Sequence, residues 1–115
     1  MQSPITTHVL DTSIGRPAEG VYVTLDFHDN GTAWKTIATG VTNADGRVTN
    51  LLHESAKLAR GIYRLTFDTA SYFHDQEALG FYPSVMVIFE INDPSAHYHV
   101  PLLLSPHGYT TYRGS

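Results

Sequence analysis

Apolar and polar side chains alternate with a period of two over much of this chain, and this period favours a fold built from β-strands. The pattern is clear in residues 21–28 and 62–68, whereas residues 85–91 are apolar on both faces until Glu90. Successive side chains of a strand point to opposite faces, so the first two runs predict half-buried strands. The third predicts a strand that is buried on both sides or lies in an interface. The predicted buried faces are Val21, Val23, Leu25 and Phe27 in the first run and Tyr63, Leu65 and Phe67 in the second.

Turn-forming residues divide the chain into short segments. Turns are predicted at Gly15 with Pro17, at residues 29–31, at Asp45 with Gly46, at residues 92–95 and at residues 105–108. Residues 5–10 and 34–41 are further strand candidates, and residues 71–79 lack alternation and predict one short helix. Seven or eight short strands, with turns about every eight to twelve residues, indicate an all-β chain folded as a β-sandwich.

Composition predicts one domain over residues 1–115 and argues against several classes of partner. A net charge of −4 with only 7 Lys and Arg argues against nucleic acid. The chain has no cysteine, which excludes disulfides, thiolate nucleophiles and cysteine-ligated metals and fits the cytoplasm. No apolar run has the length of a membrane span, and residues 1–4 lack the features of a signal peptide. Oligomerisation would help so short a chain to bury apolar surface.

Residues 97–115 are unusually rich in chemical groups for a chain end. Strand alternation places His97 and His99 on one face and Tyr98 on the other. A leucine run and a turn follow, and the chain then ends on an aromatic side chain, a cation and a hydroxyl, namely Tyr112, Arg113 and Ser115. We therefore expect this end of the chain to form part of a site.

The histidines each allow two interpretations. His8 is either a half-exposed strand residue or a general acid–base, for which an imidazole is suited near neutral pH. His97 and His99 could bind a metal, because a His-x-His pair on a strand shares a face. No Asp, Glu or Cys stands at a familiar ligand spacing nearby, which argues against a metal. Alternation does not choose between the two histidines as the catalytic one, and His97 could serve only to position its neighbours.

The remaining candidates are two arginines and two residues near the C-terminus. Arg47 follows the Asp45-Gly46 turn and is either a solvated cation or an anion clamp, because a guanidinium presents a planar fork of donors. Arg113 has the same two interpretations. Tyr112 is either a core aromatic or part of a site wall. Ser115 suits a hydrogen-bond donor, to substrate or to a neighbouring chain, better than a nucleophile.

Several blocks of the chain together resemble the 5-hydroxyisourate hydrolases, the enzymatic branch of the transthyretin-like family. The family ends in Tyr-Arg-Gly-Ser, as residues 112–115 do here. Further agreement lies in residues 7–12, 15–18, 42–47 and 81–83, and in the strand after the last of these. The resemblance covers essentially the whole chain in order and at family-like spacing.

The resemblance implies a transthyretin-like fold of two four-stranded sheets packed face to face, with one short helix. It also implies a homotetramer, a dimer of dimers whose central channel holds the sites. The apolar strand at residues 85–91 and the leucines at 102–104 fit extensive subunit contact. No metal or organic cofactor is implied.

The implied reaction is hydrolysis of 5-hydroxyisourate to 2-oxo-4-hydroxy-4-carboxy-5-ureidoimidazoline. By resemblance, His8 and His99 would activate the water and handle protons, and Arg47 would orient the substrate and stabilise an oxyanion. Tyr112 would contact the substrate, and residues 113–115, from Arg113 to Ser115, would complete the wall.

Two rival functions remain. A transthyretin-like carrier would bind hydrophobic hormones in the same channel without catalysis, but such carriers lack the histidine and arginine set and extend beyond Tyr-Arg-Gly-Ser. A metal-dependent β-sandwich hydrolase would rest on the His97/His99 pair alone.

Overall fold

A computed structural model describes residues 3–28 and 33–115, and within them it contains nine strands and one helix. The strands are β1 (Ile5–Asp11), β2 (Arg16–Pro17), β3 (Tyr22–His28), β4 (Trp34–Val41), β5 (Arg47–Val48), β6 (Gly61–Phe67), β7 (Val85–Ile91), β8 (Tyr98–Ser105) and β9 (Gly108–Thr111); the helix is α1 (Thr69–Asp75). The turn predicted at residues 29–31 lies outside the described residues.

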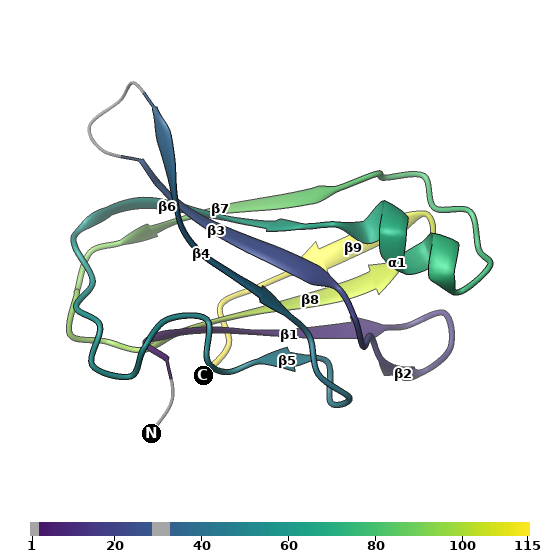
Figure 1. The fold of residues 1–115 in the computed structure, drawn as a ribbon, viewed down its shortest axis with the longest axis horizontal. Coiled ribbons are helices and arrows are strands. Elements are labelled where there is room, and N and C mark those ends of the chain that lie inside the picture. The colour runs from purple at the N-terminus through teal and green to yellow at the C-terminus, as the bar shows by residue number, and fades with distance from the viewer. Residues whose placement is uncertain (1–2, 29–32) are drawn as a thin grey trace.

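The strands form two sheets that face each other (Figure 1). One sheet has the order β2-β1-β8-β9, with β5 also paired to β1, and the other has the order β4-β3-β6-β7. β1 and β8 are parallel along their whole register, so segments from the two ends of the chain become neighbours. The predicted β-sandwich of two four-stranded sheets is confirmed, with one addition. The two-residue strands β2 and β5 occupy successive parts of the same edge of β1, so the first sheet has five strands but is four strands wide.

The core lies between the two sheets, where the predicted apolar faces meet. Leu25, Leu65 and Phe67 of one sheet and Val9 and Leu102 of the other are all completely buried. Burying a side chain of this size contributes roughly 1.5–3 kcal/mol, so these faces supply most of the drive to pack the sheets. Inward side chains alternate with outward ones along β1, and the outward ones remain available for a site.

Two predicted contact segments differ from expectation. β7 has the predicted bounds, but Met86 and Ile88 are 53% and 61% exposed, so the strand is buried on only one side within a single chain. Burial of β7 on both sides within the chain is therefore wrong, and a position in an interface stays a prediction. Leu102 and Leu104 point into the chain's own core, so the expectation that the whole leucine run serves subunit contact is wrong. Only Leu103, which is partly exposed, is available for such contact.

The helix begins and ends earlier than the predicted range of 71–79. Asp68 caps it, because its carboxylate accepts hydrogen bonds from the backbone N–H of Ser71 (3.1 Å) and from the Ser71 hydroxyl (2.8 Å). The helix ends at Asp75, and Glu77 then adopts a φ of 55°, which a helix does not allow. Among the described residues, no helix has the length and apolar character needed to cross a bilayer.

Candidate active site

The candidate residues gather on the outer face of the β2-β1-β8-β9 sheet, the face that points away from the other sheet. On β1, Ile5, Thr7 and Val9 are completely buried and point inward, so Thr6 and His8 point outward. His8 is the cross-strand partner of Arg47 on β5, and Thr6 is the cross-strand partner of His99 on β8. Cross-strand partners share a face. Three strands thus bring His8, Arg47 and His99, the set that the resemblance implies, to one surface.

A tight turn places Arg47 beside His8. The side-chain oxygen of Asn43 accepts hydrogen bonds from the backbone N–H groups of Asp45 (2.9 Å) and Arg47 (3.0 Å). Gly46 has a φ of 75°, and a Cβ at this position would collide with the carbonyl oxygen of Val9. The backbone N–H of Val9 also donates to the Gly46 carbonyl at 2.7 Å. Only glycine allows β5 to lie this close to β1, and the predicted Asp45-Gly46 turn is confirmed.

The Thr6 hydroxyl lies within hydrogen-bond distance of both His97 and His99. Thr6 Oγ1 lies 2.7 Å from Nδ1 of His99 and 3.3 Å from Nε2 of His97. The prediction that these histidines share a face is confirmed. On the other side of His99, the backbone N–H of Gly114 donates to the His99 carbonyl at 2.8 Å, which brings the C-terminal segment against the imidazole. A Cβ on Gly114 would lie 2.6 Å from His99 Cδ2, so a larger residue there would displace the ring.

A small polar depression lies over these residues. It is lined by Thr6, Thr7, Arg47, Thr49, His97, His99 and Ser115, and its volume is about 90 Å³. Pockets that enclose a small molecule usually measure about 300–1,000 Å³. One chain therefore offers one wall of a binding site, and further walls are needed to surround a ligand.

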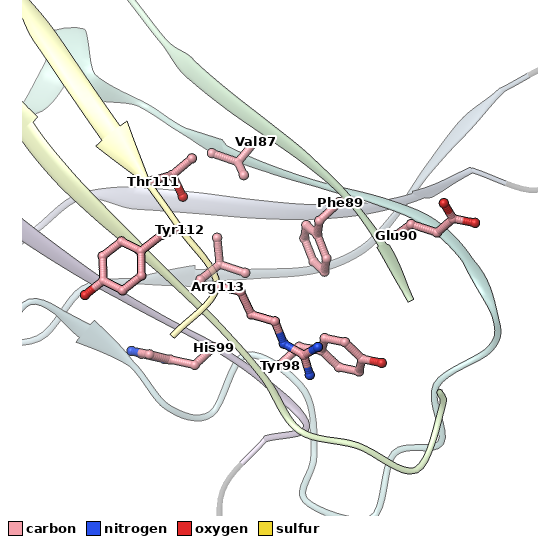
Figure 2. A pocket seen from close by; sticks show the side chains of 9 residues that line it. Val87, Phe89, Glu90, Tyr98, His99, Thr111, Tyr112 and Arg113 are labelled. Carbon is pink, nitrogen blue, oxygen red and sulfur yellow. The ribbon is translucent and has the colours of Figure 1, made fainter. Parts of the chain in front are cut away.

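The C-terminal segment sends its side chains in two directions. Figure 2 shows Tyr112 and His99 on one side of the segment and Arg113 on the other, toward Tyr98. The guanidinium carbon of Arg113 lies 4.5 Å from the centroid of the Tyr98 ring, and a guanidinium nitrogen donates to the His97 carbonyl at 3.4 Å. The structure therefore brings Ser115 together with His99 and Arg47, whereas the guanidinium of Arg113 lies against Tyr98 in a second pocket that Tyr112 and His99 also line. These contacts hold the C-terminal segment, and the predicted role of Arg113 in the substrate wall stays a prediction.

The electrostatic surroundings favour neutral imidazoles. Burial lowers the pKa of His8 below 6.5, and the charge of Arg47 lowers it further, against a hydrogen bond with the Asp45 backbone that raises it. Burial also lowers the pKa of His99, and the charges of Arg47, His8 and His97 act in the same direction. Both side chains are therefore mostly neutral at pH 7. A neutral imidazole can accept a proton from water.

Metal binding finds little support in this arrangement. Within residues 3–28 and 33–115, no three His, Asp or Glu side chains come together in a way that could hold a metal ion. The alternative based on His97 and His99 therefore lacks the third ligand that a catalytic zinc site normally has.

Thr6 is a functional candidate that is not among those from the sequence. Thr6 stands two positions before His8, on the same outward face of β1, and that spacing was the available signal. Its contact with His97 and His99 depends on the parallel pairing of β1 with β8, which joins residues more than ninety positions apart. A period-two pattern does not reveal which strands will pair.

Comparison with known proteins gives matches over nearly the whole chain. The model of the HIUase/Transthyretin family matches residues 5–114. A Mus musculus protein named 5-hydroxyisourate hydrolase is 46% identical, over 98% of this chain and 96% of its own. The solved structure of Klebsiella pneumoniae 5-hydroxyisourate hydrolase has a TM-score of 0.83 and 40% identity, covering 96% of this chain and 98% of that one. Sea bream transthyretin, solved in complex with thyroxine, has a TM-score of 0.89 and 36% identity, covering 97% and 95%.

Proposed function

This chain belongs to the HIUase/Transthyretin family, and we propose from that premise that it hydrolyses 5-hydroxyisourate to 2-oxo-4-hydroxy-4-carboxy-5-ureidoimidazoline, a step of urate degradation. The observation that carries the proposal is the meeting of His8, Arg47 and His99 on one outer face. The same chain is similar over almost all of its length to proteins named as hydrolases of this compound.

The chemistry follows from the groups on that face. Water attacks a ring carbonyl, a C–O bond forms, and the ring C–N bond breaks. One neutral imidazole of the His8/His99 pair accepts the proton of the attacking water, and an imidazolium returns a proton to the departing ring nitrogen. The Arg47 guanidinium stands beside both imidazoles and stabilises the negative charge that develops on the carbonyl oxygen. Tyr112 and Ser115 flank this centre as parts of the substrate wall.

The polar side chains on the outer face favour the enzyme over the carrier alternative. A site for a hydrophobic ligand is lined mainly by apolar side chains, whereas this depression is lined by three threonines, a serine, two histidines and an arginine. Stoichiometry separates the two functions. An enzyme should consume many equivalents of 5-hydroxyisourate per chain, whereas a carrier would remove at most one equivalent per binding site and leave the rest to decay as in buffer.

We further propose that the chain assembles as a homotetramer, a dimer of dimers in which the outer faces line a channel. β7 and β9 are edge strands of the two sheets, and each is paired on only one side among the described strands. Exposed apolar side chains accompany these edges, with Met86 and Ile88 on β7 and Tyr109 on β9. An exposed, apolar edge strand can pair with a strand of a second chain. A second outer face would supply the wall that one chain lacks.

Light scattering should therefore give the mass of a tetramer at micromolar concentration. Replacing Met86 and Ile88 by Lys should lower the mass, because charge on an interface strand opposes burial. Replacing Lys35 by Glu, on the distant edge strand β4, serves as a control and should leave the mass unchanged. A wild-type protein that is monomeric and fully active would contradict the proposed assembly.

Catalysis is expected to need no metal. Dialysis against a strong chelator should leave the hydrolysis rate within about twofold of the untreated protein, because general acid–base groups and a guanidinium supply the chemistry described above. Elemental analysis of the dialysed sample checks that metal has been removed. Activity that disappears on chelation and returns with added zinc would instead favour the metal-dependent alternative.

A further inference from the structure

The Thr6 hydroxyl is the only side-chain group of the described residues that contacts both His97 and His99 through hydrogen bonds. Thr6 is 3% exposed and lies directly across from His99 in the parallel β1–β8 pair, so its position is fixed by the sheet. The short contact of 2.7 Å to His99 Nδ1 is the stronger of the two, and the contact of 3.3 Å to His97 Nε2 is weaker.

The Thr6 hydroxyl and the rings of His97 and His99 can share their hydrogen-bonding protons in only a few ways. A threonine hydroxyl donates one hydrogen bond and can accept two, and a neutral imidazole has one nitrogen that donates and one that accepts. Thr6 can therefore donate to only one of the two histidines. If the Thr6 hydroxyl uses its own proton within this group and both rings are neutral, one histidine donates to Oγ1 and the other accepts from it.

The chemistry at His99 selects between the two arrangements. A base must offer an unprotonated nitrogen to water, and Nδ1 of His99 is already occupied by Thr6. Nε2 is the nitrogen left for water, so the proton of the neutral ring must sit on Nδ1 and be donated to Thr6. The Thr6 hydroxyl is then free to donate to Nε2 of His97.

We propose that Thr6 is a positioning residue that holds His99 in the Nδ1–H tautomer, leaving Nε2 as the base, and that His97 in turn orients the Thr6 hydroxyl. The proposal rests on the hydrolase function assigned above. The hydrogen bonds run from His99 Nδ1–H to Thr6 Oγ1, and from the Thr6 O–H to His97 Nε2. When Nε2 of His99 takes a proton from water, the Nδ1–H bond to Thr6 becomes charge-assisted and stabilises the imidazolium.

The other charges on this face oppose protonation and make the Thr6 contact more valuable. Arg47 on β5, His8 on β1 and His97 just before β8 all face His99 and disfavour its protonated form. Within the described residues, the Thr6 hydroxyl lies within hydrogen-bond distance of the His99 ring, at 2.7 Å from Nδ1, and in the proposed tautomer it accepts the Nδ1 proton. Its loss should therefore slow the step in which His99 gains a proton.

Nitrogen-15 NMR of the wild-type protein tests the tautomer directly, without reference to activity. At a pH above 7.5, where His99 is neutral, we expect a pyrrole-like shift for Nδ1 and a pyridine-like shift for Nε2. Thr6→Val should lose this pattern, because Nδ1–H no longer has its acceptor, and Thr6→Ser should keep it, because the hydroxyl remains. A wild-type His99 with its proton on Nε2 would overturn the proposal, even if no variant folds.

Kinetics of the same variants provide a second test. Thr6→Val should lower kcat on the order of tenfold with KM unchanged, and Thr6→Ser should restore it, since one hydrogen bond is lost and regained. His97→Ala should lower kcat by only about twofold to threefold, because it acts through Thr6. Thr24→Val, on β3 of the other sheet, makes the same atomic change away from any of these histidines and should have no effect.

The outcomes separate this proposal from the proposed function. A folded Thr6→Val protein with a wild-type His99 spectrum and a wild-type kcat would overturn the positioning role. An Nδ1–H tautomer in a wild-type protein that hydrolyses no 5-hydroxyisourate would overturn the proposed function and leave the tautomer assignment standing.

Discussion

His99→Ala and His8→Ala are each expected to lower the rate of 5-hydroxyisourate hydrolysis by about a hundredfold to ten-thousandfold, the usual cost of removing a general acid or base. Both imidazoles lie on the outer face that carries Arg47, and both are mostly neutral at pH 7. One neutral histidine takes the proton of water, and this proton reaches the departing nitrogen by way of the other histidine, so neither can replace the other. The rate would be followed by ultraviolet absorbance.

The fold of both variants should survive, because neither side chain is fully buried between the sheets. Circular dichroism and the mass from light scattering, each compared with the wild-type protein, would verify this. His74→Ala is a matched control, because His74 is exposed on α1 and belongs to neither sheet. This variant should keep the wild-type rate. Near-wild-type rates for well-folded His8→Ala and His99→Ala proteins would show that the catalytic assignment is wrong.

Arg47→Ala is expected to lower the rate by about a hundredfold to thousandfold, the range found when a donor to a developing oxyanion is removed. Arg47→Lys should recover only part of the loss, because an ammonium keeps the charge but not the planar fork of donors. Arg16→Ala is the control. Arg16 lies in β2, on the same edge of β1, but its cross-strand partner is Asp11, whereas the partner of Arg47 is His8. An Arg47→Ala protein as fast as wild type would remove the guanidinium from the mechanism.

The same variant should change the pH profile in a defined direction. Burial first and Arg47 second lower the pKa of His8 and of His99, so the wild-type rate should stay level above pH 6.5 and fall only as pH drops through those lowered values. Without the positive charge of Arg47, both pKa values should rise, and the fall in rate should begin at a higher pH. A profile whose acid limb stays in place would show that Arg47 does not act on the histidines.

The layers of this fold follow from a pattern that is local in sequence. A period of two predicts β3, β6 and β7 within one residue at each end, because apolar side chains on one face of a strand need a core to cover them. The period-two alternation does not predict β2 or β5, because these strands have two residues each and form only through pairing with β1. The early start of α1 depends on the Asp68 cap, a residue that the alternation of the preceding strand assigns to that strand.

The candidate site is predictable in its members but not in its arrangement. His8, Arg47 and His99 come from three separate blocks of the sequence, and their meeting depends on the Asn43–Gly46 turn and on the parallel pairing of β1 with β8. Arg113 shows the limit most clearly. Its neighbours Tyr112 and Gly114 lie beside His99, while its own side chain turns toward Tyr98, as alternation along an extended segment requires.

The most direct measurement is the decay of freshly generated 5-hydroxyisourate with and without this protein. Urate oxidase would produce the compound and then be removed by filtration, and the ultraviolet absorbance would be followed at once. We expect the decay rate to rise in proportion to the protein concentration, over many substrate equivalents per chain. Decay that matches buffer alone at every concentration of folded protein would contradict the assignment of hydrolase activity to this site.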